Sequence, residues 1–257
     1  MQTTRNNDKL NVLITRPTKK AQALSYLLNE QHIACVNQPL FDYQPLANQQ
    51  TSKDLLVNSD IIIFVSIAAV EFAHTTFNSK KWRYKHIIAV GKATKKALQQ
   101  VDINSVISPN QENSEGLLTL PLLSEDLSGK VVTIVRGNGG REHLAKHLKE
   151  SGATVNYLES YQRVWRTFTK DISSQWFKQK INCIVVTSNA ILEKLVQLAV
   201  DKHDQQLTSY WKNRCIWLVA SQRISDKAKQ LGLTHVVLSN GASEQAIITA
   251  LDKLKNI

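Results

Sequence analysis

VVTIVRGNGGREHLAKHLKESGATVNYLESY, residues 131–161, is the stretch that decides the fold. An apolar, β-branched run is followed by a Gly-rich turn, a segment with helical apolar spacing and a second extended segment. This pattern predicts a strand–helix–strand unit. The stretch VLITRPTKKAQALSYLLNEQHIACVNQPLF (12–41) repeats it without a gap, and Arg136 aligns with Arg16. The chain therefore contains an internal duplication, which constrains the architecture before any single motif does.

A second duplication relates the middle of the chain to its last third. The matched segments share an apolar strand-like run followed by a small or hydroxylated residue and a helical pattern. The pairs are DIIIFVSIAAVEFA (60–73) with NCIVVTSNAILEKL (182–195), HIIAVGKATKKALQQ (86–100) with RCIWLVASQRISDKAKQ (214–230), and NSEGLLTLPL (113–122) with ASEQAIITAL (242–251).

The order of these repeats predicts that one domain is discontinuous. One half runs continuously through 60–122 and 131–161, whereas the half that starts at 182 must be completed by 12–41. The expected parts are a discontinuous domain of 1–39 plus 165–257, an inserted domain of 44–160, and an interdomain linker of two strands at 39–44 and 160–165.

Strand-like and helical segments alternate along the whole chain, which indicates parallel sheets with helices on both faces. We therefore expect the α/β class, with two flavodoxin-like doubly wound parallel-sheet domains joined by the two-stranded linker. The first helix is expected over 18–30 with Thr18 as its cap, and Thr94 is expected to open a later helix.

Length and composition fit a two-domain globular protein. The chain has 257 residues, of which 42% are hydrophobic, and no apolar run approaches the length that spans a membrane. The N-terminal residues lack the apolar core of a signal peptide. Cys35, Cys183 and Cys215 are widely spaced in apolar segments, so we expect buried free thiols and a cytoplasmic protein.

The formal net charge of +11 favours an acidic partner. Nucleic acid and a small polyanion are the two classes that this charge suggests, and a basic surface without a specific role is the alternative. Nucleic-acid binding predicts clustered cations with exposed aromatic residues. The lysines are instead spread along the helices, so we expect a small anionic ligand and no nucleic-acid or membrane partner.

The expected strands end in small, hydroxylated or cationic residues, each directly before a helix. They are Thr15-Arg16, Ser66, Gly91-Lys92, Arg136-Gly137, Thr187-Ser188 and Ala220-Ser221. Ligands of open parallel sheets bind beyond the carboxyl ends of the strands, and helix N-termini attract anions. A ligand with several carboxylates or phosphates in the interdomain cleft would suit this set. For each Ser or Thr alone, a helix N-cap is the alternative interpretation.

Motifs for cofactors, metals and nucleophiles are missing from the sequence. RGNGGRE (136–142) has Glu142 where a dinucleotide fingerprint needs its third glycine. His143 and His147 are four residues apart but lack the partners of a metal site. The sequence therefore offers no recognisable cofactor or metal motif.

The chain resembles the bacterial uroporphyrinogen-III synthase family. The resemblance rests on VLITRP (12–17), FVSIAAVEF (64–72), AVGKAT (89–94), SEGLL (114–118), IVRGNGGREHLAKHLKESGATVNYLESYQRV (134–164) and VVTSNAILEKL (185–195). It implies two α/β domains and a monomeric enzyme of tetrapyrrole (heme) biosynthesis that needs no cofactor. The implied reaction cyclises hydroxymethylbilane to uroporphyrinogen III, with loss of water and inversion of the last pyrrole ring. The implied substrate is a linear tetrapyrrole with an acetate and a propionate on every ring.

The resemblance also suggests roles for individual residues. Tyr161 matches a family tyrosine that could act as general acid, with packing at the hinge as the alternative. Arg141 matches a family arginine after the Gly-rich turn, with a surface or structural charge as the alternative. Ser221 is a doubtful contact, because VASQRI (219–224) departs from the Gly and Thr pattern of AVGKAT. The expected substrate-binding residues are Arg16, Ser66, Gly91, Thr94, Arg136, Gly137, Arg141, Thr187, Ser188 and Ser221.

The rival to an enzyme is a non-catalytic two-domain binding protein for a polyanionic small ligand. It could use the same fold, because a fold does not determine function.

Overall fold

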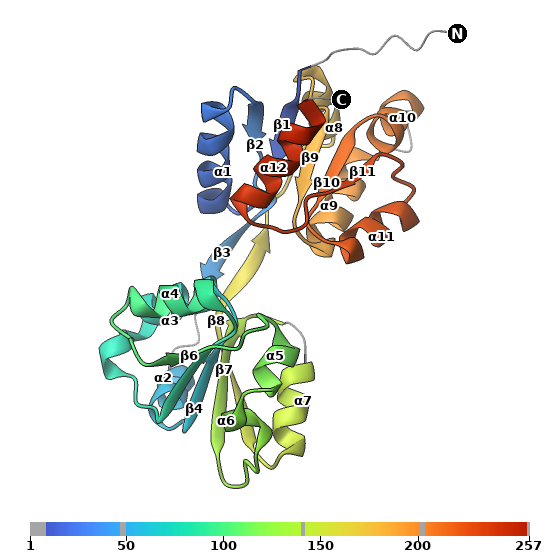
Figure 1. Cartoon of the computed structure of the whole chain (residues 1–257). Helices are drawn as coiled ribbons and strands as arrows, with labels where there is room; N and C mark the ends of the chain where they lie inside the picture. Colours follow the sequence, from blue (N-terminus) through green and yellow to red (C-terminus); the bar gives the residue numbers. More distant parts are fainter. Residues whose placement is uncertain (1–8, 47–49, 140–141, 201–203, 256–257) are drawn as a thin grey trace. The chain divides into compact units, whose positions relative to one another are not determined.

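Two parallel sheets, each covered by helices, organise the chain in the computed structural model (Figure 1). The structure describes residues 9–46, 50–139, 142–200 and 204–255. The chain divides into two units, 1–42 with 165–257 and 43–164, which are called unit 1 and unit 2 below. The expected α/β class with two parallel-sheet domains is confirmed.

Unit 1 contains a five-stranded sheet in the order β11-β10-β9-β1-β2. All of its pairs are parallel, and Val12 to Ile14 lie between Cys35 to Asn37 on one side and Cys183 to Val185 on the other. The elements are β1 (Asn11–Ile14), α1 (Thr18–Glu30), β2 (Ala34–Asn37), α8 (Ile172–Lys178), β9 (Cys183–Val186), α9 (Asn189–Ala199), α10 (Gln205–Asn213), β10 (Ile216–Val219), α11 (Gln222–Gln230), β11 (Val236–Leu238) and α12 (Glu244–Lys255).

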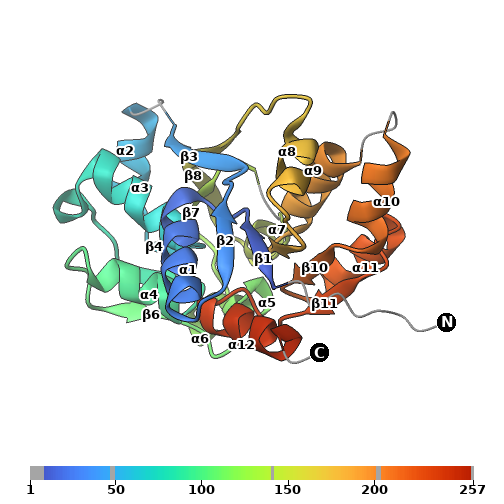
Figure 2. The same cartoon turned by 90° about the horizontal axis from the view of Figure 1, so that it is seen from above.

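Alternate side chains of the central strands in unit 1 face the same helix layer. Val12 and Ile14 of β1 pack with Leu24 and Leu28 of α1, and with Leu251 of α12. Figures 1 and 2 both show α1 and α12 side by side on this face. The β1 side chains are fully buried, and burying one large aliphatic side chain is worth about 1.5–3 kcal/mol. The apolar spacing of α1 and the β-branched run of β1 therefore determine this layer together.

Unit 2 contains the order β8-β7-β4-β5-β6, extended by β3 beside β8. The pairs among β4 to β8 are parallel, and β4 lies between β5 and β7. The elements are β3 (Phe41–Pro45), α2 (Gln50–Val57), β4 (Ile61–Phe64), α3 (Ile67–Phe77), a short 3-10 helix η1 (Ser79–Lys81), β5 (His86–Ala89), α4 (Lys92–Gln99), β6 (Val106–Ile107), α5 (Ser114–Leu118), α6 (Pro121–Ser124), β7 (Val131–Gly137), α7 (His143–Glu150) and β8 (Thr154–Trp165).

The continuous apolar run of β4 is explained by burial on both faces of the sheet. Ile62 and Phe64 belong to the core under α2, α3 and α4, whereas Ile61 and Ile63 belong to the core under α5, α6 and α7. All four side chains are at most 2% exposed. A strand with one solvated face would instead alternate between apolar and polar residues.

The two sheets have the same spatial order once the strands are matched by their repeats. The order β2-β1-β9-β10-β11 of unit 1 corresponds position by position to β8-β7-β4-β5-β6 of unit 2. The duplication seen in the sequence is thus present in the sheets. The first strand in chain order occupies a different position in each sheet. When the strands are numbered along the chain within each unit, unit 1 has the flavodoxin order 2-1-3-4-5, and unit 2 has a permuted form of that order.

The structure corrects three local expectations. Thr18 does not cap α1, because the extended Pro17 (ψ 148°) occupies the cap position and the Thr18 hydroxyl instead lies 3.3 Å from Asp42 Oδ1. Thr94 does not open a helix, because α4 begins at Lys92 and Thr94 is buried inside its first turn. Cys35 is only half-buried, since β2 is an edge strand, whereas Cys183 and Cys215 are buried free thiols.

We expect the fragment 44–160 to fold alone, because it retains β4 to β7 and nearly all of the β8 pairing with β7. In a fragment of 1–160, β1 would lack β9, its neighbour on one side. Hydrogen exchange should therefore show protected amides in 44–160 but rapid exchange over 12–30 of the 1–160 fragment. Protection of 12–30 in that fragment would contradict the expected discontinuous domain.

Candidate active site

Each sheet has one position where the strand order reverses, and ligands of doubly wound sheets bind outside the carboxyl ends at such a position. In unit 1 it lies between β1 and β9, and in unit 2 it lies between β7 and β4. The predicted site residues at these strand ends are Arg16, Thr187 and Ser188 in unit 1, and Ser66, Arg136 and Gly137 in unit 2.

Tyr161 and Ser66 are in hydrogen-bond contact at the reversal point of unit 2. The Tyr161 hydroxyl lies 3.2 Å from Ser66 Oγ, and either group could donate. Ser66 is also the N-cap of α3, where its Oγ accepts the backbone N–H of Ala69 at 3.0 Å. The cap uses only an acceptor site of Ser66, so its O–H proton can still point to the phenol oxygen. The phenol is therefore held at the positive end of a helix dipole.

A β-bulge in β8 determines where Tyr161 points. Arg136 of β7 pairs with Glu159, but the next β7 residue, Gly137, pairs with Tyr161, so Ser160 is the extra residue. Such a bulge changes the direction of the side chains that follow it. The Ser160 hydroxyl donates to the carbonyl of Ala69 at 3.3 Å, which ties the bulge to α3.

Gly137 leaves the space that the Tyr161 ring occupies. A Cβ atom at this position would lie 2.6 Å from both Cε2 and Cζ of the ring. That distance is well inside van der Waals contact, so a larger residue would have to displace the phenol. The close approach of the Tyr161 ring therefore explains why residue 137 is glycine.

Two further aromatic rings contact Tyr161. Phe72 of α3 is stacked on it, with centroids 5.5 Å apart, and Tyr43 of β3 meets it edge to face at 4.8 Å. The ring also packs against the core of unit 2. The sequence left two alternatives for Tyr161, a packed ring and a hydroxyl that acts on the substrate. In the structure the ring is packed and the hydroxyl is held by a hydrogen bond.

Arg136 is held by carboxylates at the end of β7. Its guanidinium donates to Glu142 at 2.9 Å and to Glu159 at 3.2 Å, and it lies 3.7 Å from the centre of the Tyr157 ring. Burial opposes the charge, but the carboxylates outweigh it and raise the pKa of Arg136 above its ordinary value. Glu159 also accepts the backbone N–H of Gly139 at 3.1 Å. This network positions the Gly-rich turn and leaves Arg136 less able to bind a substrate than predicted.

Tyr157 completes the Arg136 network. Its hydroxyl donates to Glu142, and burial followed by this bond raises the pKa of Tyr157 to about 12. The same bond, together with Arg136, lowers the pKa of Glu142. Tyr157 therefore keeps its proton and Glu142 its charge at neutral pH.

Arg16, which matches Arg136 in the duplication, is also engaged inside its own unit. It is 5% exposed, and its guanidinium donates to Glu244 at 2.7 Å and to the carbonyl of Ala242 at 3.0 Å. The ion pair connects the end of β1 to the start of α12. The geometry favours a structural role for Arg16 over direct contact with a ligand.

Ser188, Ser221 and Gly91 lie at the starts of helices. Ser188 caps α9 by accepting the N–H of Ile191 at 3.3 Å, and Thr187 precedes it. Ser221 and Gly91 occupy the N-cap positions of α11 and α4; the Ser221 hydroxyl makes no capping bond, and glycine has no side chain to make one. Thr94 is buried within α4 and does not face solvent. Arg141 lies outside the described residues, so its role stays a prediction.

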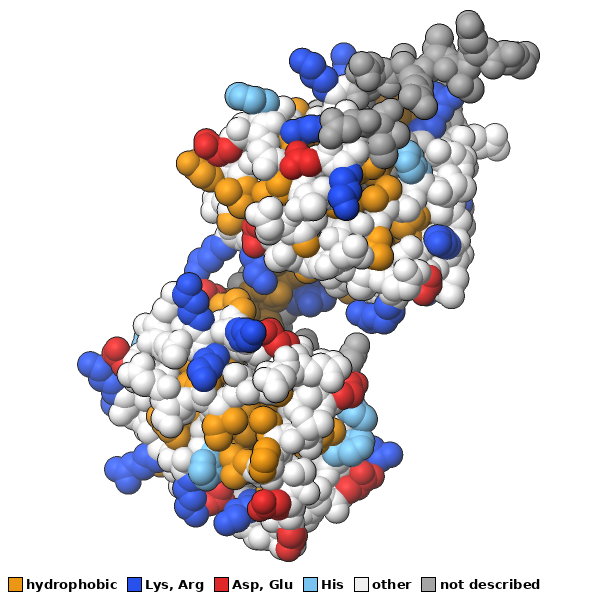
Figure 3. Space-filling model, in the orientation of Figure 1, with side chains coloured by type: hydrophobic (Ala, Val, Ile, Leu, Met, Phe, Trp, Pro, Cys, Tyr) orange, Lys and Arg blue, Asp and Glu red, His pale blue; other side chains and the backbone are white. Residues whose placement is uncertain are grey.

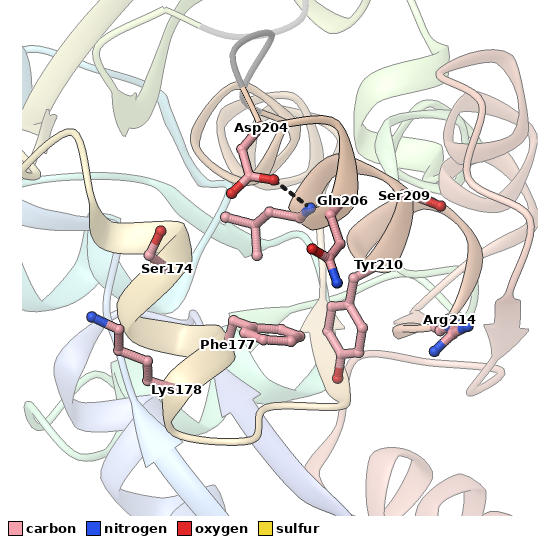
Figure 4. A pocket seen from close by; sticks show the side chains of 9 residues that line it. Ser174, Phe177, Lys178, Asp204, Gln206, Ser209, Tyr210 and Arg214 are labelled. Carbon is pink, nitrogen blue, oxygen red and sulfur yellow. Dashed lines mark hydrogen bonds between the residues drawn. The ribbon is translucent and has the colours of Figure 1, made fainter.

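A separate pocket of about 460 Å³ lies between α8 and α10 in unit 1 (Figure 4). Asp204 caps α10 there by accepting the N–H of Leu207 at 2.8 Å. The lining residues are Ser174, Phe177, Lys178, Asp204, Gln206, Leu207, Ser209, Tyr210 and Arg214. The pocket belongs to a helix layer and contains none of the predicted site residues, so we assign it no part of the chemistry.

The surface in Figure 3 shows lysine and arginine side chains spread over the visible face and interspersed with acidic ones. On this face the described cations do not form one continuous stripe. Among the described residues there is no cluster of three or more His, Cys, Asp or Glu that could hold a metal ion. No described helix is both long enough and apolar enough to cross a membrane.

Comparisons with known proteins match most of the chain to one family. A sequence profile described as "Uroporphyrinogen-III synthase HemD" matches residues 22–249. The uroporphyrinogen-III synthase of Salmonella typhimurium is 32% identical over 94% of this chain and 100% of its own length. The corresponding protein of Escherichia coli is 31% identical over the same shares of the two chains.

The chain belongs to the uroporphyrinogen-III synthase family. Two solved synthases have a similar fold. The one from Thermus thermophilus covers 96% of this chain and 100% of its own, with a TM-score of 0.66 and 14% identity. The one from Helicobacter pylori covers 95% and 99%, with a TM-score of 0.58 and 15% identity.

Sequence reasoning missed three neighbours of Tyr161 in this synthase-family chain: Tyr43, Phe72 and Arg163. Tyr43 falls within the expected linker strand 39–44, and no role is predicted for Phe72. Arg163 lies two residues after Tyr161 in β8, so both side chains point to the same face of the strand. That spacing is a sequence signal that could have identified Arg163.

Replacing Gly137 with alanine should lower kcat by about 10–100-fold, because the added Cβ displaces the Tyr161 ring and a misplacement of about 1 Å can have this effect. Steady-state kinetics with hydroxymethylbilane would measure the change. The control is Gly232→Ala in unit 1, where φ is +80° and the nearest atom would be 3.9 Å away. The control should lose stability but keep its turnover. An unchanged kcat in Gly137→Ala would show that the ring position is unimportant.

Proposed function

We propose that this protein cyclises hydroxymethylbilane to uroporphyrinogen III, with loss of water and inversion of the last pyrrole ring. Membership of the uroporphyrinogen-III synthase family supports the reaction. The observation that carries the assignment of a site is the contact between Tyr161 and Ser66 at the strand reversal of unit 2. A proton donor there lies where doubly wound sheets bind their ligands.

Tyr161 acts as the general acid in this proposal. When the C–O bond of the hydroxymethyl group breaks, the phenol proton passes to the departing oxygen, which leaves as water. Ser66 can then donate its O–H to the phenolate oxygen, and the helix dipole of α3 favours the same negative charge. The cationic methylene that remains forms the carbon–carbon bond that closes the ring, and the proton lost from the pyrrole carbon restores the phenol. Phe72 and Tyr43 restrict the ring, so the proton is delivered from one place. Closure of the macrocycle then depends chiefly on which atoms are held together.

Carboxylates of the substrate are held at carboxyl ends of strands in this proposal. We keep Ser66, Gly91, Gly137, Thr187, Ser188 and Ser221 as candidate contacts, because they lie at or beside the starts of helices that offer backbone N–H groups. Arg141 is the candidate cation after the Gly-rich turn. Arg16 and Arg136 instead hold the ends of β1 and β7 in place through their ion pairs, and Thr94 is buried within α4.

We further propose that the enzyme works as a monomer in the cytoplasm, on a small linear tetrapyrrole and without a cofactor. Free thiols at Cys35, Cys183 and Cys215 are consistent with a reducing compartment. The non-catalytic binding protein is the less favoured alternative, because named members of the family are synthases. Incubation with hydroxymethylbilane and analysis of the isomer separates the two. If the type I ring, the spontaneous product, still dominates, the enzyme assignment is wrong.

Tyr161→Phe should lower kcat with little change in Tm, because phenylalanine keeps the packing and removes only the proton donor. General acid–base help is typically worth about 10²–10⁴-fold. We expect the lower end or less, since the hydroxyl also departs without the enzyme. The remaining product should still be the type III isomer, as measured by chromatography of the oxidised porphyrins. Full activity would show that Tyr161 is structural, and a switch to type I would mean that it holds the last ring.

Arg141→Ala should raise KM for hydroxymethylbilane, and KM of the wild type should rise with added salt. Carboxylate contacts near the surface are screened over about 8–10 Å at physiological ionic strength. The matched control is Arg83→Ala, which removes an exposed arginine before β5, away from the strand carboxyl ends. If Arg141→Ala leaves KM unchanged at low salt, the residue does not bind the substrate.

A further inference from the structure

The dipeptide Asn-Gly occurs twice in the chain, each time in a loop that follows a strand. Asn138-Gly139 follows β7 in unit 2, and Asn240-Gly241 lies between β11 and α12 in unit 1 (Figure 1). An asparagine before glycine is prone to lose its side-chain amide, because glycine has no Cβ to hinder the approach of its backbone nitrogen to the asparagine side chain. Both asparagines are exposed, so solvent access does not distinguish the two copies.

Backbone hydrogen bonds hold the Asn138 copy in place. The N–H of Asn138 donates to the carbonyl of Tyr161 at 2.7 Å, and the N–H of Gly139 donates to Glu159 Oε1 at 3.1 Å. Glu159 is itself fixed by Arg136. The nitrogen that would have to attack Asn138 is therefore bound to a carboxylate, whose negative charge also opposes the loss of the N–H proton that the attack requires.

The Asn240 copy lacks these backbone bonds. No described residue accepts a hydrogen bond from the N–H of Asn240 or of Gly241. The loop is held through its oxygens instead, since the Ser239 hydroxyl donates to the carbonyl of Gly241 at 2.8 Å and Arg16 donates to that of Ala242 at 3.0 Å. Asn240 has a φ of 55°, in the left-handed region that Gly and Asn tolerate best. The turn into α12 thus favours the two residue types that are prone to deamidation.

We propose that Asn240 is a site of deamidation in the folded protein and that Asn138 is protected from the same reaction. Solvent hydroxide takes the proton of the Gly241 N–H, and the nitrogen forms a bond to Asn240 Cγ. The bond between Cγ and Nδ2 breaks, and Nδ2 takes a proton from water and leaves as ammonia. Water then opens the resulting succinimide at either carbonyl, which gives aspartate or isoaspartate.

The modification changes unit 1 beside the end of β1. Either product adds a negative charge to the loop that contacts Arg16. Isoaspartate also lengthens the backbone by one carbon just before Ala242, so it shifts the carbonyl that Arg16 binds. The inference does not depend on the proposed function, because the chemistry requires only Asn240, Gly241 and water.

The experiment follows both sites by peptide mass spectrometry in the full chain at mildly alkaline pH, once folded and once unfolded in urea. In urea the two sites should convert at similar rates, because both are Asn-Gly. In the folded protein Asn240 should convert about tenfold or more faster than Asn138, since a hydrogen bond to a charged group is strong enough for such an effect. Methylation by an isoaspartate-specific methyltransferase should label the Asn240 peptide, and Asn240→Asp supplies the unlabelled aspartate reference.

Glu159→Ala tests the protection directly, because it removes the acceptor of the Gly139 N–H. It should raise the rate at Asn138 and leave the rate at Asn240 unchanged. The matched control is Glu150→Ala, which removes an exposed carboxylate of α7 and should change neither rate. The wild-type comparison decides the matter even if Glu159→Ala is less stable. Equal rates at the two sites in the folded wild type, or an Asn240 amide that is lost only in urea, would overturn the inference.

Discussion

The pairing of β1 with β9 is the constraint on which the architecture depends. Val12 to Ile14 pair with Cys183 to Val185, and the hydroxyl of Thr15 donates to the carbonyl of Val185 at the end of the same ladder. Residues from the start of the chain thereby complete a sheet whose other strands come from the last third. A chain built this way must leave unit 1 and return to it. The two passages are β3 and β8, and the return passage carries Tyr161.

The strands can be predicted from the sequence because a strand buried on both faces of its sheet needs a continuous apolar run. Apolar runs such as IIIF (61–64) and VLI (12–14) alternate with segments of helical apolar spacing, and this alternation predicts parallel sheets. The repeats then predict which strands of the two sheets correspond. The partners of the charged side chains could not be predicted. Arg16 and Glu244 are far apart in the chain, and so are Asp42 and Arg166, so their pairing depends on the packed fold. The bulge at Ser160 has no compositional mark, yet it determines the direction of Tyr161.

The sequence predicts that the cations at strand ends all contact the ligand. In the structure, Arg16 and Arg136 instead form ion pairs with acidic residues of their own unit. Arg16 is buried and Arg136 is half-buried, each beside acidic residues, where losing one partner would leave an unpaired charge. Such residues make the strand ends rigid. A rigid end is useful to an enzyme that works by positioning, because the groups that meet the substrate do not have to be ordered when it binds. Sequence alone cannot separate these two uses of arginine.

The matched strand orders describe a history of the polypeptide as well as a fold. Read from β4, the strands run β4, β5, β6, β7, β8 and then β9, β10, β11, β1, β2, and each group of five forms its sheet in the same arrangement. Two copies of one ancestral five-stranded module in tandem would have this order. Joining the end of the second copy to the start of the first, and opening the second copy between β11 and β1, the counterparts of β6 and β7, converts that tandem into the present chain. The discontinuous unit can thus be understood as a circular permutation of a simple gene duplication.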